Sequence, residues 1–430
     1  MKRFVLVAAR VATPTELLLN GFVAIVGGSV SEVGDGIPPT TPTTLDLGDV
    51  LIAPGFVDVH VHGGGGAQVN CATREEVEVS VRRMARFHAT HGTTALLATT
   101  VSDSPEALRA AVEGVAAVAT APRGGSGPGI LRTGHLTDDG PGAVVLGSHL
   151  EGPWIARSRA GAQFVPALRP PSVAELDDLV ARGNGTVRLV TIAPELEGAL
   201  DLITAARFSG VVVSIGHTDA DYATTKLAFD AGASHATHLF NAMAPVHHRR
   251  PGPIAAALGD ERVSLEIIAD GVHIHPALIA LVATLAPERL VLVTDAIGAT
   301  GAPPGLHRLG PLEVLVTDDR AVLAGNSETV AGSVLTMDRA VALAVDVARV
   351  PLLTALKAAS LHPAGVLGEN RKGRLTPGAD ADLVVLDRQL DVVATIVGGQ
   401  VVYDPTGLLS RLADGAVLSS DGATEPASRP

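Results

Sequence analysis

The amino-acid sequence predicts an α/β protein: a (β/α)8 TIM-like barrel with a small β-sandwich domain formed by the N- and C-terminal segments. In the middle of the chain, apolar runs are followed by a polar or glycine-containing turn and then by a helical pattern, and this theme repeats eight times. Both ends of the chain contain short apolar runs without helical spacing, which is typical of strands. With 430 residues, 47% of them apolar, the chain can bury a large core.

The terminal segments are predicted to pair into one domain. Residues 4–9 and 21–26 are predicted strands of a segment that spans residues 1–54. Residues 382–387 and 392–397 are two further strands within residues 366–407. Because a chain that begins and ends in β structure often pairs those ends, we expect residues 1–54 and 366–407 to form the small domain. Residues 408–430 are rich in Ser, Ala, Gly and Asp and are predicted to be disordered.

The barrel is predicted to span residues 55–365. Its eight strands are expected at residues 55–62, 93–100, 143–151, 187–194, 211–217, 234–240, 264–270 and 290–295. Helical patterns lie between them, for example over residues 74–91, 172–183, 220–232 and 276–286. The connections after the third and eighth strands are long, so we expect them to carry insertions.

Charge and composition narrow the range of partners. The formal net charge is −13 and no basic run is present, so we expect no nucleic-acid partner. No stretch of about 18 apolar residues occurs, so we expect no membrane span. The first seven residues are predicted to form a strand rather than a signal peptide, because Arg10 and Glu16 soon interrupt the apolar pattern. Cys71 is the only cysteine, which fits a reducing compartment such as the cytoplasm.

Metal-binding residue types lie at the ends of the predicted strands. The six residues at these ends are His60, His62, Glu151, His217, His238 and Asp295, and Asp270 and His273 close the seventh strand. Because the carboxyl ends of parallel barrel strands meet at one rim, we expect the six to converge there. Side chains alternate along a strand, so His60 and His62 point to the same side.

This donor set is typical of a divalent metal site. Imidazole and carboxylate ligands suit Zn²⁺, the expected ion, and also Fe²⁺, Mn²⁺ or Co²⁺. There are enough donors for one or two ions, and Glu151 could bridge a pair. A single histidine at a strand end is more often structural, and we expect this of His88, His91 and His235. Six suitable residues at the ends of five strands are much harder to explain by chance.

The motifs around these residues resemble a known family. Residues 54–63, PGFVDVHVHG, resemble the first-strand signature of the amidohydrolase superfamily. HLEGPW at 149–154, GHT at 216–218, THLFNAM at 237–243, DGVH at 270–273 and VTDA at 293–296 together resemble the N-acetylglucosamine-6-phosphate deacetylases. The likeness runs from about residue 50 to 390. HLFNAM is its most specific part, whereas His-x-His marks many hydrolases.

The resemblance implies a role for each matching residue. Glu151, His217 and His238 would hold the principal metal, and His60 and His62 a second ion that only some family members use. Asp295 would be the general base and acid. The sugar phosphate would be held by Asn241, the backbone of Ala242, Arg249 and His273. The family also implies a homodimer, in which Arg249 could serve the neighbouring chain's pocket.

One position departs from the family pattern. Gln163 stands twelve residues after Glu151, where the family usually has a histidine that polarises the acetyl carbonyl or holds the substrate. Glutamine can donate a hydrogen bond but cannot become cationic. Two alternatives therefore stay open: an amidohydrolase that acts on a different N-acylated sugar or amino acid, and a non-catalytic barrel that binds a sugar phosphate. Asn241 and Arg249 argue against the first, and Asp295 with its full ligand set argues against the second.

Overall fold

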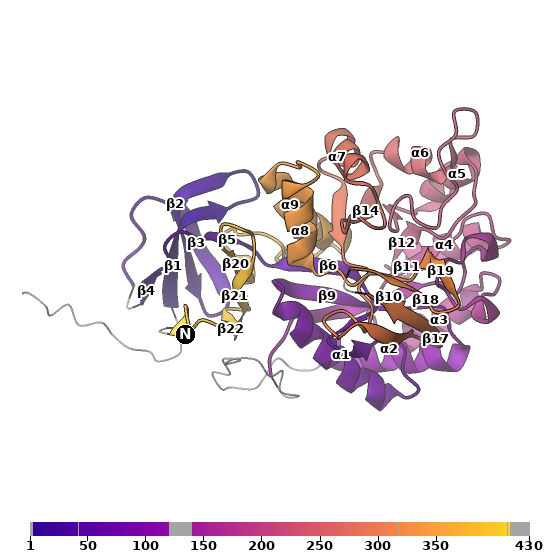
Figure 1. Cartoon of the computed structure of the whole chain (residues 1–430), viewed down its shortest axis with the longest axis horizontal. Coiled ribbons are helices and arrows are strands. Elements are labelled where there is room, and N and C mark those ends of the chain that lie inside the picture. Colours follow the sequence, from indigo (N-terminus) through magenta and orange to yellow (C-terminus); the bar gives the residue numbers. More distant parts are fainter. Residues whose placement is uncertain (1–2, 42, 120–139, 318, 411, 413–430) are drawn as a thin grey trace, which may run out of the picture.

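The structure is a computed structural model that describes residues 3–41, 43–119, 140–317, 319–410 and 412. Figure 1 shows a barrel surrounded by helices, with a separate sheet beside it that contains strands from both ends of the chain. The predicted fold class is confirmed.

The sheet of the small domain joins the two terminal segments. It consists of β1 (Arg3–Ala12), β2 (Leu17–Val26), β3 (Ser29–Asp35), β4 (Thr44–Asp46), β5 (Leu51–Pro54), β20 (Leu383–Leu386), β21 (Val392–Val397) and β22 (Gln400–Tyr403). The strand order is β22-β21-β20-β5-β1-β2-β3, with β4 beside β1, so the eight strands are hydrogen-bonded into one continuous sheet. The two ends of the chain meet where β5 pairs antiparallel with β20, Ile52 opposite Val385.

The end of the chain is partly included in this domain. Most of the predicted disordered tail lies outside the described residues, namely 411 and 413–430. Leu409, however, is fully buried in the core of the small domain, against the sheet. The predicted tail therefore begins too early. The predicted domain limits, with the barrel over residues 55–365, stay a prediction, although the chain changes from one sheet to the other at Gly55.

The barrel strands follow one another in sequence order and are all parallel. They are β6 (Phe56–Val61), β9 (Thr93–Thr100), β10 (Val144–Glu151), β11 (Val187–Ile192), β12 (Val212–Ile215), β13 (His235–Ala236), β14 (Ser264–Ile268) and β15 (Leu290–Val293). Every residue of β6, β9 and β15 is buried, as expected for parallel strands covered on both faces. A parallel bridge between Val61 and Ala296 closes the ring between the first and last strands.

The helices lie where apolar residues recur at helical spacing. They are α1 (Arg74–Ala89), α2 (Pro105–Ala119), α3 (Val173–Arg182), α4 (Ala199–Phe208), α5 (Tyr222–Ala231), α6 (Gly252–Leu258), α7 (Pro276–Leu285), α8 (Met337–Asp346), α9 (Leu352–Ala359) and α10 (Leu361–Val366). In α1, a capping box of Thr73 and Glu76 starts the helix, and Val77, Val81 and Met84 form the buried face. No helix in the described ranges is long and apolar enough to cross a membrane.

Insertions extend the carboxyl side of three strands. A hairpin of β7 (Gly63–Gly64) and β8 (Ala67–Gln68) follows β6. Two 3₁₀ turns, Arg157–Arg159 and Val165–Ala167, follow β10. After β15 comes an antiparallel sheet of β16 (Gly305–Leu309), β17 (Leu312–Val316), β18 (Ala321–Leu323) and β19 (Asn326–Val330). The predicted insertions after the third and eighth strands are therefore present.

Candidate active site

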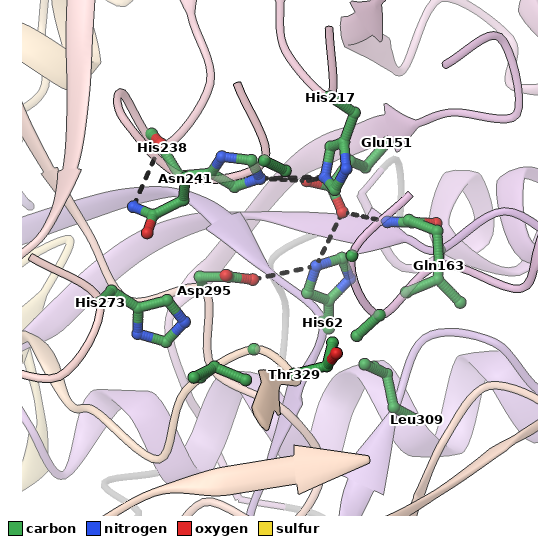
Figure 2. Close-up of a pocket in the computed structure, with 16 residues that line it drawn as sticks. His62, Glu151, Gln163, His217, His238, Asn241, His273, Asp295, Leu309 and Thr329 are labelled. Carbon is green, nitrogen blue, oxygen red and sulfur yellow. Dashed lines mark hydrogen bonds and ion pairs between the residues drawn. The ribbon is translucent and has the colours of Figure 1, made fainter. Parts of the chain in front are cut away.

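The carboxyl rim of the barrel brings the six predicted strand-end residues together. His60 lies in β6 and His62 directly follows it, while Glu151 is the last residue of β10. The other three, His217, His238 and Asp295, follow β12, β13 and β15 within two residues. Figure 2 shows that the side chains of His62, Glu151, His217 and His238 converge and that Asp295 points toward His62.

Glu151, His217 and His238 form a compact group of possible ligands. The Nε2 atoms of His217 and His238 lie 3.2 Å and 3.0 Å from Glu151 Oε1, and 3.1 Å from each other. Around a tetrahedral Zn²⁺ with bonds of about 2.0–2.1 Å, ligand atoms lie roughly 3.3 Å apart. The spacing therefore fits one divalent ion.

His60, His62 and Glu151 form a second group that shares the same carboxylate. The two imidazole Nε2 atoms lie 3.3 Å apart. His60 Nε2 is 3.3 Å from Glu151 Oε1, and His62 Nε2 is 3.3 Å from Glu151 Oε2. Glu151 thus presents one oxygen to His60, His217 and His238 and the other to His62, so its carboxylate belongs to both groups.

The tautomers of three histidines are fixed by their outer ring nitrogens. Nδ1 of His60 lies 3.1 Å from a carboxylate oxygen of Glu266. Nδ1 of His62 lies 3.1 Å from the carbonyl of Thr99, and Nδ1 of His217 lies 2.8 Å from the carbonyl of Arg159. Each acceptor requires Nδ1 to donate, so each Nε2 presents a lone pair to Glu151. Three lone pairs and a carboxylate repel one another unless a cation lies between them, so the donor set fits a divalent metal.

The electrostatics of the site also favour positive charge. Burial alone would lower the pKa of His62, but its hydrogen bonds to Asp295 and Glu151 raise it to about 9. Burial would raise the pKa of Glu151, but the charges of His60 and His217 hold it well below its usual range. In the absence of a metal, this site therefore takes up protons, and a bound metal ion would replace them.

Asp295 lies beside both ligand groups. Its Oδ1 is 3.1 Å from His62 Nε2 and 3.5 Å from His60 Nε2. Burial would raise the pKa of Asp295, but the charge of His60 and the hydrogen bond to His62 lower it, so the carboxylate is ionised. An ionised carboxylate at this position can accept a proton from a water molecule near the ligands.

The backbone is strained at three of these residues. His217, His238 and Asp295 have φ angles of 47°, 27° and 51°, a region that non-glycine residues rarely adopt and that costs about 1–3 kcal/mol per residue. Neighbouring segments hold Asp295 in this conformation: its N–H donates to His60 O at 2.9 Å, and Ser333 N–H donates to its carbonyl at 2.8 Å. The strain turns each side chain into the site, directly after its strand.

A pocket of about 240 Å³, partly open to solvent, lies against the two ligand groups. Asn241, Ala242, His273 and Gln163 line it, and their role in substrate binding stays a prediction. His273 Nδ1 lies 2.6 Å from Asp270 Oδ2. Burial would lower the pKa of His273, but the hydrogen bond and charge of Asp270 raise it, so this ring can carry the positive charge that an anionic substrate needs.

Gln163 contacts a metal-site carboxylate directly. Its side-chain N–H donates to Glu151 Oε2 at 2.5 Å, and its Oε1 accepts the N–H of Ser102 at 2.6 Å. These two bonds fix the orientation of the amide. Gln163 therefore points into the site, as a neutral donor.

Arg249 is the one predicted substrate-binding residue that the structure leaves outside the pocket. It is exposed, and its guanidinium donates to His248 Nε2 at 2.7 Å. It is not among the residues that line the pocket. Because Arg249 does not line the pocket of its own chain, its predicted role in holding the substrate stays a prediction.

Several residues that shape the site are not predicted from the sequence. Leu309 and Thr329, from the sheet inserted after β15, line the pocket, and nothing in their chemistry indicates it. Glu266 accepts a hydrogen bond from His60, and here the sequence does hold a signal. It is a carboxylate at the centre of the otherwise apolar strand β14, Ser-Leu-Glu-Ile-Ile.

Comparison with known proteins agrees with this geometry. Residues 51–402 match the amidohydrolase family. N-acetylglucosamine-6-phosphate deacetylase from Bos taurus is 39% identical over 83% of this chain and 85% of its own length. N-acetylgalactosamine-6-phosphate deacetylase from Escherichia coli O157:H7 is 37% identical over 92% and 98%.

A solved structure shows the same fold over its whole length. A mutant N-acetyl-D-glucosamine-6-phosphate deacetylase from Mycobacterium smegmatis, in complex with N-acetyl-D-glucosamine-6-phosphate, superposes with a TM-score of 0.85 and 40% identity. The match covers 94% of this chain and 100% of that one. The chain therefore belongs to the amidohydrolase family, among the N-acetylglucosamine-6-phosphate deacetylases.

Proposed function

We propose that this protein hydrolyses the acetamide bond of N-acetylglucosamine 6-phosphate and releases glucosamine 6-phosphate and acetate, a step of amino-sugar catabolism. One observation carries the proposal: three anchored imidazole lone pairs converge on Glu151 beside the ionised Asp295, at the wall of a pocket that is partly open to solvent. The relatives named above support the choice of substrate.

The donor set supports Zn²⁺ as the ion, with Fe²⁺, Mn²⁺ or Co²⁺ as alternatives. Glu151, His217 and His238 would hold the principal ion, and His60 and His62 a second one. When bound, such an ion supplies Lewis acidity, which polarises the amide carbonyl and makes a water molecule acidic enough to attack at neutral pH.

The chain's own residues would then move the proton and hold the substrate. Asp295 accepts the proton of the attacking water and passes it to the nitrogen of the leaving amino sugar. Gln163 offers a neutral donor near the acetyl group. Asn241 and the backbone of Ala242 orient the sugar, and His273 with its raised pKa attracts the phosphate.

The active form would be a cytoplasmic homodimer. Arg249 is exposed and lies outside its own chain's pocket, so it is free to reach the phosphate in the pocket of a second copy. A guanidinium fork matches phosphate oxygens well. The single cysteine, Cys71, fits a reducing compartment.

A second candidate substrate is N-acetylgalactosamine 6-phosphate. The relative of that name aligns over 98% of its own length, more than the Bos taurus deacetylase does. The two sugars differ only in the orientation of one hydroxyl group, which a pocket can discriminate through its hydrogen bonds.

The test is acetate release from four compounds by protein of known metal content. They are N-acetylglucosamine 6-phosphate, its galactosamine counterpart, unphosphorylated N-acetylglucosamine and an N-acetyl amino acid. We expect kcat/KM to be highest for the first. A higher value for the second would establish the second candidate, and a preference for the amino acid would make the protein a different amidohydrolase. Sugar-phosphate binding without any acetate release would make it a non-catalytic barrel.

A further inference from the structure

Glu266 is a buried carboxylate whose surroundings call for an explanation. It lies at the centre of β14 and has no exposed surface. Burying a charged carboxylate costs several kcal/mol unless its oxygens are well paired. In the described parts of the chain, its side-chain oxygens accept hydrogen bonds from two histidine rings and one backbone N–H.

One oxygen of Glu266 contacts both groups of possible metal ligands. Its Oε2 accepts Nδ1–H of His60 at 3.1 Å and the backbone N–H of His238 at 3.0 Å. His60 belongs to the group with His62, whereas His238 belongs to the group with His217. Glu151 contacts both groups from the pocket side, and Glu266 contacts both from the side away from the pocket.

The two contacts act in different ways. The bond to His60 selects the tautomer whose Nε2 lone pair faces Glu151, and it fixes the orientation of the ring. His238 Nδ1 has no acceptor in the described residues, so this ring is not anchored through its own outer nitrogen. Its backbone carries the strained φ of 27°, and the N–H bond to Glu266 holds that backbone in place.

His235 braces the carboxylate from its other side. Its Nε2 lies 2.8 Å from Glu266 Oε1, and both side chains are fully buried. The brace fixes the rotation of the carboxyl group, so Oε2 can face His60 and His238 together. His235, which the sequence analysis expects to be structural, is thus part of the metal site's support.

We propose that Glu266 is a positioning residue that aligns His60 and His238, so that both ligand groups converge on Glu151. The inference rests on the proposed metal-dependent function and adds a residue to its site. Glu266 does not line the pocket, so it would act through the two histidines and not by direct contact with substrate. Loss of such supporting partners typically weakens metal binding about 10- to 100-fold.

The test starts from metal-free protein and adds Zn²⁺ in competition with a chelating dye. It measures the dissociation constant of each Zn²⁺ ion that binds. Glu266→Met has similar volume but accepts no hydrogen bond, so it leaves Nδ1–H of His60 and the N–H of His238 without an acceptor. We expect roughly 10- to 100-fold weaker binding of at least one ion. The matched control is Asp382→Asn, which changes an equally buried carboxylate in the small domain and should leave every dissociation constant unchanged.

A second variant keeps the negative charge of Glu266 but changes the position of its carboxylate. Glu266→Asp draws the carboxylate back by one methylene, so a single oxygen can no longer reach both His60 and His238. We expect weakened Zn²⁺ binding here too, including in the case that Glu266→Met does not fold. Wild-type dissociation constants in either folded variant would overturn the inference. If wild-type protein itself bound no divalent ion, the proposed function would fail instead.

Discussion

The small domain and the rim of the barrel both bury carboxylates, but they neutralise them differently. Beside the sheet of the small domain, Lys372 Nζ lies 2.7 Å from Asp382 Oδ2 and 3.0 Å from Asp380 Oδ2. Lys372 and Asp382 are nearly inaccessible to solvent, with 3% and 2% of their surface exposed. The chain therefore supplies the compensating cation itself.

At the rim, the buried carboxylates of Glu151, Glu266 and Asp295 are paired with histidines. Histidine can be a neutral ligand or a cation, so these partners leave room for an ion from solution. Buried charge therefore serves stability in the small domain, where its partner is a lysine of the same chain. At the rim, where its partners are histidine rings, it supports a site that can bind a metal.

The largest effect that we predict is the loss of activity when the metal is removed from the rim. We expect thorough chelation to abolish acetate release and Zn²⁺ addition to restore it. The fold should persist, because His60 and His62, with their raised pKa values, can take up protons in place of the ion. The measurements are the hydrolysis rate and the circular dichroism spectrum. Full activity after chelation would show that the rim needs no external cation.

Asp295→Asn should have the next largest effect. Asparagine keeps the shape of the side chain but cannot take a proton, so we expect kcat to fall roughly 10²- to 10⁴-fold. Metal content should stay near the wild-type value, since Glu151 and the four histidines remain. Asp382→Asn is the control and should keep kcat. Turnover close to wild type in Asp295→Asn would remove this carboxylate from the proposed mechanism.

Lys372→Met tests the buried ion pair of the small domain. It leaves Asp382 buried without its cation, so the free energy of unfolding should fall by about 3–5 kcal/mol. Ions bound per chain and kcat should not change at temperatures where the variant is folded. The control is Lys357→Met, which breaks a pair with the exposed Glu288 and should cost about 1 kcal/mol or less. Loss of metal in Lys372→Met would mean that the two regions are not independent.

The sequence predicts well that the strand-end residues meet at the rim, because their positions follow from topology alone. Once eight apolar runs are identified as parallel strands, His60, Glu151 and Asp295 must meet at one rim. The limits of the strands are less predictable. The segment at residues 234–240 is predicted to be one strand, yet β13 ends at Ala236, because His238 and Phe240 adopt positive φ angles. Apolar pattern cannot reveal backbone strain at non-glycine residues.

The supporting residues are harder to predict for a different reason. Glu266 and Ser102 act through hydrogen bonds whose partners lie far away in the sequence, and no spacing rule connects them. The inserted sheet of β16–β19 can be expected from the length of its connection. That Leu309 and Thr329 line the pocket depends on how this sheet packs, which the sequence does not show.

Arg249 differs both from the buried Lys372 and from a metal ion at the rim, because its cationic side chain is exposed. Arg249→Ala should change neither stability nor metal content. It should raise KM for the phosphorylated sugar roughly 10- to 100-fold, the loss expected for charged hydrogen bonds of about 1.5–3 kcal/mol. KM for the unphosphorylated sugar should not change, and Arg250→Ala, the adjacent exposed arginine, should be silent.

Mixing two defective variants shows which chain Arg249 serves. An Arg249→Ala chain retains Asp295, and an Asp295→Asn chain retains Arg249. If the arginine reaches the pocket of the neighbouring chain, a heterodimer contains one complete site, in the Arg249→Ala chain. Activity at low substrate concentration should then reappear when the two proteins are mixed and allowed to exchange subunits. If no activity returns although heterodimers form, Arg249 acts on its own pocket or not at all, since only a residue contributed across the interface can complement a partner.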